Sequence, residues 1–233
     1  MFIKMDTKAL FSSLPQSYHD PIPACIIVGA GDRMHQISPT PGKDDLVIAA
    51  DGGYRYLRDA GIRCDLLMGD LDSLPRDTVI ATETKRFDPV KDDTDTMLAV
   101  RHGLECGYRK FLLYGMFGGR FDHTLGTMQT VAFLTRAGAK GYAFEEAGDG
   151  KHASYVTALY NDTRTFSPDA SGYLSLVAWG GEARDVTLQN LKYPFAGGTF
   201  DPDVALGISN EFLPGLPARV TVGDGLLLMV KPV

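Results

Sequence analysis

Two different hydrophobic patterns divide the chain. In the N-terminal part, short apolar runs bounded by glycine alternate with stretches whose apolar residues recur at helical spacing. Such alternation is typical of parallel strands joined by crossover helices. It predicts strands at residues 24–28, 46–50, 66–68 and 111–114. It predicts helices at residues 54–60, 94–106 and 123–137, the second ended by Gly107.

Beyond about residue 150, apolar and polar residues alternate with a period of two, and no long helical pattern is visible. Turn residues rich in glycine, proline and aspartate separate these runs, as in antiparallel β-sandwiches. The predicted strands are residues 173–177, 183–188, 218–222 and 226–230. We therefore predict an α/β domain with a parallel sheet over residues 1–150 and an antiparallel β-sandwich over residues 151–233. The boundary is placed at the Gly-Asp-Gly segment 148–150.

Composition restricts the function without identifying it. With 44% hydrophobic and 22% charged residues the chain is predicted to be globular, and a net charge of -6 excludes an overall basic field for nucleic acid. No apolar run is long enough to span a bilayer, and the N-terminus mixes charges into its apolar residues, so we predict a cytoplasmic protein. Cys25, Cys64 and Cys106 are far apart in sequence and are predicted to be reduced and structural.

Polar residues gather where the predicted strands end. Glycine, or glycine together with aspartate, follows each of the four strands predicted in the N-terminal half. In open α/β sheets the carboxyl ends of the strands form the ligand crevice. Five aspartates lie at these ends or at the next helix start: Asp51, Asp70, Asp72, Asp92 and Asp95.

The spacing of these aspartates favours a shared cation. Asp70 and Asp72 are two residues apart in an extended turn, so both carboxylates are expected to point to the same side of the chain. Asp92 and Asp95 are three residues apart at a helix start, so they are expected to lie on one face of that helix. If the pairs converge, their repulsion requires a counter-ion, and Mg²⁺ is held by carboxylates together with substrate phosphates. The alternative is that each aspartate only caps a helix or forms a turn.

A second segment, residues 118–123 (GGRFDH), lies between a predicted strand and a predicted helix. Its glycines allow close approach of a phosphate, the following helix start offers N–H donors, and Arg120 can bind phosphate oxygens bidentately. Neither a Walker loop nor a complete dinucleotide fingerprint is present. The alternative is a flexible turn with a surface arginine, and His123 is a phosphate-site candidate or a helix cap.

Taken together, these segments resemble the thiamine pyrophosphokinase family. Its motifs match residues 51–53 (DGG), 69–73 (GDLDS), 91–95 (KDDTD) and 118–123 (GGRFDH), in this order. The resemblance continues through residues 191–195 (LKYPF) and 207–212 (GISNEF), which are similar to the family's thiamine-binding domain. It covers most of the chain from about residue 46 onward.

The resemblance implies a Rossmann-like catalytic domain, a β-sandwich and a homodimer with thiamine bound between the two subunits. It implies that Asp70 and Asp72, with Asp92 or Asp95, bind Mg²⁺, and that Asp51 belongs to the same catalytic group. It implies contacts to ATP and its phosphates from Lys91, Asp92, Thr94, Gly118, Gly119, Arg120, Asp122, His123 and Ser73. Ser209 and Asn210 are implied to face thiamine. Trp179, in a segment that departs from the family's pattern, is either a thiazolium-binding ring or a core residue.

The implied reaction is attack by the hydroxyethyl oxygen of thiamine on the β-phosphorus of ATP, with Asp72 or Asp95 accepting the proton. Positioning and charge neutralisation suffice for such a transfer. Three alternatives stay open at this point: a diphosphotransferase for another small alcohol such as a pterin, a non-catalytic thiamine or nucleotide sensor, and a metal-stabilised interaction module.

Overall fold

The computed structural model describes residues 14–32, 37, 40–72, 74, 82–88, 92–146 and 153–232. The chain forms two compact units. Residues 22–130 and 141–145 form the α/β unit, and the described residues up to 21, from 131 to 140 and from 146 onward form the β unit. The predicted boundary at residues 148–150 lies outside the described residues, so the division at that point stays a prediction.

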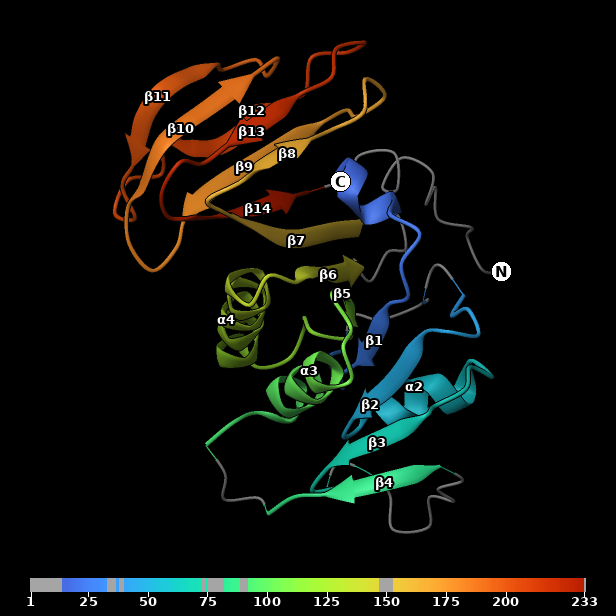
Figure 1. Cartoon of the computed structure of the whole chain (residues 1–233). Coiled ribbons are helices and arrows are strands. Elements are labelled where there is room, and N and C mark those ends of the chain that lie inside the picture. Colours follow the sequence, from blue (N-terminus) through green and yellow to red (C-terminus); the bar gives the residue numbers. More distant parts are fainter. Residues whose placement is uncertain are drawn as a thin grey trace. The chain divides into compact units, whose positions relative to one another are not determined.

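The α/β unit is built on a parallel sheet whose strands follow the order β6-β5-β1-β2-β3-β4 (Figure 1). Its central strands are fully buried apolar runs, as expected for a sheet covered on both faces. Parallel pairing joins β5 to β1, β1 to β2, β2 to β3 and β3 to β4. The strands are β1 (Cys25–Val28), β2 (Leu46–Ala50), β3 (Leu66–Gly69), β4 (Glu83–Arg86), β5 (Lys110–Tyr114) and β6 (Lys140–Glu146).

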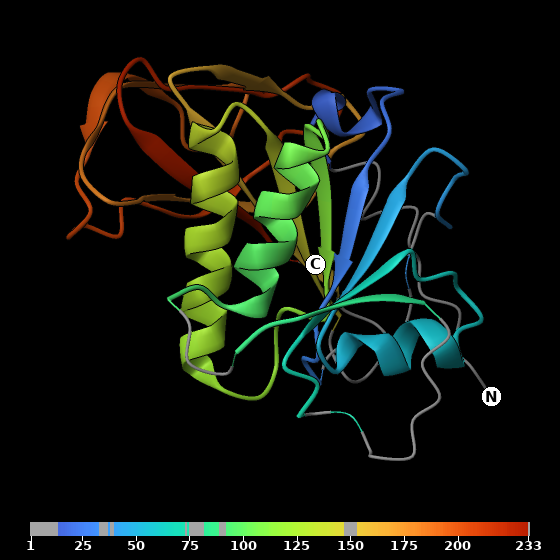
Figure 2. The same cartoon turned by 60° about the horizontal axis from the view of Figure 1, so that its bottom comes forward.

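Helices cover both faces of this sheet. Helix α2 (Gly53–Asp59) connects β2 to β3, whereas α3 (Asp95–Glu105) and α4 (Phe121–Arg136) precede β5 and β6. From β1 the sheet continues through β2 and β3 to β4 on one side, and through β5 to β6 on the other. Because crossover connections are right-handed, helices that connect strands in these two directions lie on opposite faces of the sheet. Figures 1 and 2 show this arrangement, with α3 beside α4 and α2 across the sheet from them.

The reversal of direction occurs between β1 and β5. Backbone N–H groups of Gly29 and Gly31, just after β1, donate to the carbonyls of Tyr114 and Gly115 at the end of β5, both at 2.8 Å. A Cβ atom at Gly31 would lie 2.3 Å from the carbonyl oxygen of Phe117. Only glycine permits this approach of the two strand ends, and ligands in open α/β sheets bind at such a switch point.

The β unit is antiparallel throughout its recorded pairings. One set of strands follows the order β12-β9-β14-β7, and a separate four-stranded sheet follows the order β11-β10-β13-β8. The short 3-10 helix η1 (Gln16–His19) belongs to the same unit. The strands are β7 (Ala153–Tyr160), β8 (Thr163–Thr165), β9 (Tyr173–Ala178), β10 (Ala183–Gln189), β11 (Phe195–Phe200), β12 (Gly207–Glu211), β13 (Arg219–Thr221) and β14 (Leu226–Lys231).

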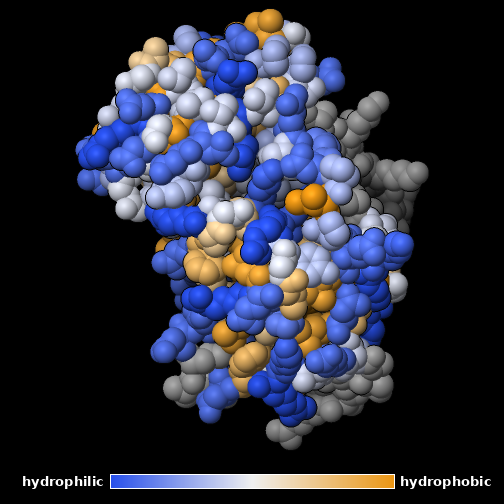
Figure 3. Space-filling view, in the orientation of Figure 1, coloured by the Kyte–Doolittle hydropathy of each residue, from blue (hydrophilic) through white to orange (hydrophobic). Residues whose placement is uncertain are grey.

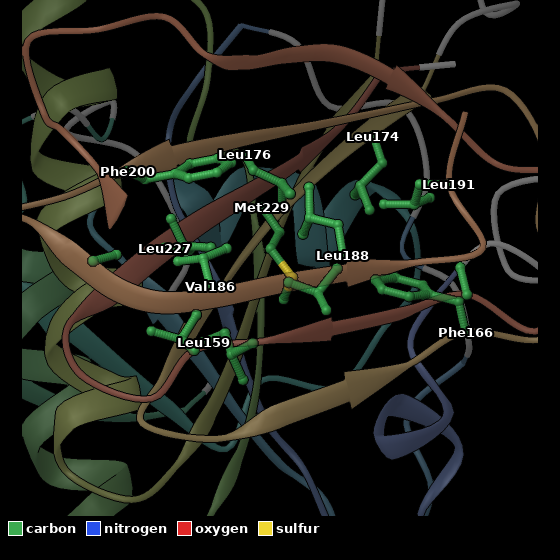
Figure 4. Packing of buried hydrophobic residues seen from close by; sticks show 14 of the residues in the cluster. Leu159, Phe166, Leu174, Leu176, Val186, Leu188, Leu191, Phe200, Leu227 and Met229 are labelled. Carbon is green, nitrogen blue, oxygen red and sulfur yellow. The ribbon is translucent and has the colours of Figure 1, made fainter. Parts of the chain in front are cut away.

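A common hydrophobic core joins the two sheets of the β unit. Leu176 and Met229 from one sheet pack with Val186 and Leu188 from the other, and Phe200 closes one side (Figure 4). Leu176, Val186, Leu188 and Met229 lie in strands that were predicted from the sequence, whereas Phe200 lies in β11, which was not. The predicted fold class, a parallel α/β region followed by an antiparallel β region, is confirmed.

Every predicted helix and strand is present, with ends shifted by up to two residues. The prediction missed β4 and β6 in the α/β unit, and β7, β8, β11 and β12 in the β unit. Strand β4 shows why, because none of its residues is buried and its sequence, ETKR, carries no apolar run. The cysteines were predicted correctly, since Cys25, Cys64 and Cys106 are all free thiols.

The face shown in Figure 3 is mainly hydrophilic, with smaller hydrophobic patches over the region of α3 and α4. Phe121 and Leu125, one turn apart on α4, are among the exposed large hydrophobic residues. None of the helices in the described ranges combines the length and apolar character needed to cross a bilayer.

Candidate active site

The aspartates predicted from the strand ends meet in the α/β unit. Asp51 directly follows β2 and Asp70 directly follows β3. Carboxylate oxygens of Asp51, Asp70 and Asp72 all lie within 4.8 Å of one another, with Asp51 and Asp70 partly exposed and Asp72 exposed. Two like charges about 4 Å apart repel by roughly 4 kcal/mol at an effective dielectric of 20. This arrangement therefore favours a bound cation with a preference for oxygen ligands.

Glycines close to Asp51 and Asp70 allow the two strand ends to approach each other. A Cβ atom at Gly69 would lie 3.0 Å from the Cβ atom of Asp51, and one at Gly53 would lie 1.9 Å from the carbonyl oxygen of Val28. Asp51 itself has a left-handed backbone (φ 49°), and its N–H group donates to Met68 at 2.8 Å. The glycines of the DGG and GD segments thus allow backbone contact between neighbouring strand ends.

A cavity of about 800 Å³ lies over the same strand ends. Its size suits a small molecule such as a nucleotide. Every site residue predicted in the α/β half that the structure describes lines this cavity. These residues are Asp51, Asp70, Asp72, Asp92, Thr94, Asp95, Gly118, Gly119, Arg120, Asp122 and His123. Ser73 and Lys91, predicted as phosphate ligands, lie outside the described residues.

Residues at the start of α3 cap the helix and also line the cavity. Thr94 is the N-cap residue, and its Oγ1 atom accepts a hydrogen bond from the Met97 N–H group at 3.2 Å. Asp95 lies in the first turn, where a negative charge is favourable. The N-cap of α3 is therefore Thr94, which also lines the cavity, and not one of the aspartates for which capping was the predicted alternative.

The glycine-rich segment places an arginine at the cavity. Gly118 and Gly119 both have left-handed backbones, with φ angles of 86° and 74°. Arg120 follows them and donates two hydrogen bonds to Asp122, from Nε at 3.1 Å and from Nη2 at 2.6 Å. These hydrogen bonds lower the pKa of Asp122 and raise the pKa of Arg120, because each group stabilises the charged form of the other. Both groups are therefore charged at neutral pH.

The cavity has further wall residues that were not predicted as site residues. Gly29, Ala30, Gly31 and Asp32 come from the end of β1, whose glycine–aspartate ending was visible in the sequence. Asp93 belongs to the predicted KDDTD segment and accepts a hydrogen bond from Arg101 at 2.8 Å. Gly115 likewise is the glycine that follows a predicted strand. The remaining residues carry no local signal: Ala50, Thr96, Met116, Gly126, Thr127 and Thr130.

The residues predicted to face thiamine lie in the β unit. Asn210 is buried, and its side chain makes hydrogen bonds with the backbone of Tyr193, accepting at 3.0 Å and donating at 2.8 Å. Ser209 is exposed and has a left-handed backbone (φ 60°). Asn210 thereby joins the LKYPF and GISNEF segments, which are also linked by the bridge between Leu191 and Phe212.

Trp179 is half-buried after β9. Its N–H group donates to Leu226 at 3.0 Å, and its carbonyl oxygen accepts from Arg136 at 3.5 Å. These contacts involve only its backbone, so both predicted uses of the ring stay open.

Comparison with known proteins connects both units to one family. Residues 41–141 match the family model for the thiamin pyrophosphokinase catalytic domain, and residues 165–227 match the model for the thiamin pyrophosphokinase vitamin B1 binding domain. The chain is 26% identical over 214 residues to the thiamine pyrophosphokinase of Bacillus subtilis (strain 168), which covers 88% of this chain and 97% of that protein.

Solved structures show the same fold. The crystal structure of the Bacillus subtilis thiamine pyrophosphokinase superposes with a TM-score of 0.78 at 23% identity, covering 90% of this chain and 98% of that chain. The thiamin pyrophosphokinase of Geobacillus thermodenitrificans gives 0.76 at 24% identity, covering 90% and 97%. The thiamin pyrophosphokinase of Candida albicans gives 0.70 at 13% identity, covering 89% of each chain.

Proposed function

The chain belongs to the thiamin pyrophosphokinase family, and on this premise we propose that it transfers a diphosphate group from ATP to thiamine, yielding thiamine diphosphate and AMP. The observation that supports this most directly is the acidic group of Asp51, Asp70 and Asp72 on a cavity that also carries Arg120. Carboxylates and an arginine on one wall are what a metal-bound triphosphate requires.

The residues present fit magnesium. The three clustered side chains offer only carboxylate oxygens, and their partial exposure leaves room for water and phosphate ligands. We propose that Asp70 and Asp72 hold Mg²⁺ with Asp51, and that Asp92 and Asp95 extend the same acidic wall. When bound, the ion neutralises charge on the triphosphate. Asp92 and Asp95 line the cavity, but the tight group among the described residues does not include them.

The chain's own groups then have distinct tasks. The hydroxyethyl oxygen of thiamine attacks the β-phosphorus of ATP, a new oxygen–phosphorus bond forms, and the bond from the β-phosphorus to the bridging oxygen of AMP breaks. Asp72 or Asp95 takes the hydroxyl proton. Arg120 stabilises the negative charge on the transferred group, and the cavity walls align donor and acceptor. Such alignment and charge stabilisation account for most catalysis in phosphoryl-type transfer.

The predicted alternatives are less well supported. Residues 165–227 match a vitamin B1 binding domain, which supports thiamine and not a pterin as the acceptor alcohol. A non-catalytic thiamine or nucleotide sensor would bind its ligand without the complete set of aspartates that lines this cavity, and an interaction module would not need a site for ATP. We retain two expectations from the family resemblance, a homodimer and thiamine contacts from Ser209 and Asn210. A thiazolium contact from Trp179 and a cytoplasmic location, both predicted from the residues themselves, also stay as proposals.

A product assay tests the proposal. The purified chain is incubated with Mg²⁺, ATP and thiamine, and the products are identified by mass spectrometry. We expect thiamine diphosphate and AMP in equal amounts. Formation of ADP with thiamine monophosphate, or binding without any product, would contradict a diphosphate transfer.

Asp72→Asn is the matching variant, because it removes charge but keeps size. We expect turnover to fall by at least about 100-fold, which is typical when one transition-state charge contact is lost. The circular dichroism spectrum should not change, since Asp72 is exposed. Asp44→Asn is the control, because Asp44 is exposed and is not among the residues lining the cavity.

A further inference from the structure

We propose that Asp122 is a positioning residue for Arg120 and does not itself bind the substrate. This inference rests on the proposed function and assigns a different role to a residue that the sequence grouped with the phosphate ligands. The observation is the paired hydrogen bond, from Nε of Arg120 to Oδ1 of Asp122 at 3.1 Å and from Nη2 to Oδ2 at 2.6 Å. Both residues line the cavity.

Charge decides what Asp122 can do there. Its carboxylate has no hydrogen to donate at neutral pH, and its hydrogen bonds with Arg120 lower its pKa further. A bare carboxylate repels phosphate oxygens, so a direct contact with ATP phosphates is unfavourable. Asp122 can therefore assist phosphate binding only through a cation, and Arg120 is the cation that it contacts.

The geometry of the pair leaves Arg120 available to a phosphate. A guanidinium group has five N–H donors, and Asp122 accepts from the side formed by Nε and Nη2. Both hydrogens of Nη1 and one hydrogen of Nη2 are not used by this pair. The Nη1 and Nη2 atoms of Arg120 can therefore donate to a phosphate while Nε and Nη2 donate to Asp122.

In the part of the chain that the structure describes, the Arg120 side chain makes its hydrogen bonds with Asp122. Its side chain is 76% exposed, and the two residues before it are glycines with left-handed backbones. Ordering a free arginine side chain on ATP binding costs rotamer entropy. Asp122 is itself anchored, since its Oδ1 atom accepts a hydrogen bond from the His123 N–H group at 3.0 Å. The start of α4 thus fixes Asp122, and Asp122 restricts Arg120 before ATP binds.

A double-mutant cycle tests this role. The full chain, Asp122→Ala, Arg120→Ala and the double variant are compared by kcat and KM for MgATP at saturating thiamine. We expect Asp122→Ala to raise KM about tenfold with kcat changed less than threefold, because ATP binding must now order Arg120. In the Arg120→Ala background the same change should have less than a twofold effect, since the residue on which Asp122 acts is gone. Asp122→Asn, which keeps one acceptor oxygen, should lie between the wild type and Asp122→Ala.

Two outcomes would overturn the inference. An equal loss from Asp122→Ala in both backgrounds would show that Asp122 acts independently of Arg120. A lower KM for ATP in Asp122→Ala would show that Asp122 competes with phosphate for Arg120. The thermal midpoint of each variant separates these results from a weakened start of α4, where any negative charge is stabilising.

The control and the readout keep this test separate from the proposed function. Asp59→Ala removes an exposed aspartate that pairs with Arg58 at 2.8 Å on α2, and neither residue lines the cavity, so KM should stay unchanged. The same cycle is measured by MgATP affinity in the absence of thiamine. If the chain does not transfer diphosphate, the product assay shows it. If Asp122 does not act through Arg120, the effects of Asp122→Ala and Arg120→Ala on MgATP affinity add up in the double variant.

Discussion

Lys231 is a buried cation far along the chain from the cavity residues. It ends β14, and its Nζ atom donates to the carbonyl oxygen of Pro232 at 2.9 Å. Burial disfavours the charged form and therefore lowers the pKa of Lys231 from its ordinary value of 10.5. At neutral pH the folded chain must either bury a charged ammonium group or release its proton, and both cost free energy. We therefore expect Lys231 to lower the stability of the β unit at neutral pH.

We predict that Lys231→Met increases the free energy of unfolding at pH 7 by roughly 1 kcal/mol, because it keeps the buried stem and removes the charge. Between the lowered pKa and 10.5 the unfolded wild-type chain binds more protons than the folded chain, so wild-type stability rises with pH in this window. The advantage of the variant should therefore shrink as the pH approaches 10.5. Urea unfolding at several pH values measures this.

Lys192→Met is the matched control for this prediction. Lys192 donates to Glu211 at 2.6 Å, and this hydrogen bond raises its pKa, so its removal should give no gain in stability. A gain for Lys192→Met as large as that for Lys231→Met would show that burial is not the cause.

Glycines have opposite roles in the helices of the α/β unit. Gly53 begins α2, and its position is so close to β1 that a Cβ atom would meet the carbonyl oxygen of Val28 at 1.9 Å. Gly126 lies inside α4, and a Cβ atom there would have no atom within 4 Å. The first glycine allows a helix to pack on a strand end, whereas the second, which also lines the cavity, lowers the helix propensity of α4.

We predict opposite effects of alanine at these two positions. Gly53→Ala should destabilise the chain by more than about 3 kcal/mol, because the carbonyl group of β1 must move. Gly126→Ala should stabilise it by about 0.5 to 1 kcal/mol, because it raises helix propensity without a clash. Denaturant unfolding of both variants measures the difference. Similar effects in both would contradict the packing described for α2.

Charge acts on the molecule as a whole. The net charge is -6, and the cavity wall adds local negative charge from its aspartates. ATP is itself a polyanion, so it should bind poorly unless a divalent cation accompanies it. The β unit has its own hydrophobic core, so we expect the cation to act on ATP binding in the α/β unit.

We therefore predict that MgATP stabilises the chain and that neither component does so alone to the same extent. At a concentration 100 times the dissociation constant, MgATP should add about 2.7 kcal/mol to the stability of the unit that binds it. Thermal unfolding with ATP plus a chelator should show little of this shift, and Asp72→Asn should abolish it. A fall in the midpoint with chelator alone would instead favour a metal-stabilised interaction module.

The sequence by itself determined most of the architecture, since local patterns report burial. The runs at β1, β2, β3 and β5 are apolar because both of their faces are covered, and the spaced apolar residues of β10 follow one buried face. Strands β9 and β14 were also predicted from alternation, but consecutive residues are buried in both of them. The exposed edge strand β4 has no such signal and was missed. The aspartate and glycine segments were visible because strand ends and helix starts have characteristic residues.

Only the tertiary structure decided which of these residues meet. The distance between Asp51 and Asp70 depends on the parallel register of β2 and β3, and the side chains of α4 reach the cavity because α4 follows the switch point at β5. The pairing of Arg120 with Asp122, and the two hydrogen bonds between Asn210 and Tyr193, likewise depend on side-chain directions. Residue types and spacing along the chain set local conformation, whereas contacts between separate segments require the register and packing of the folded sheet.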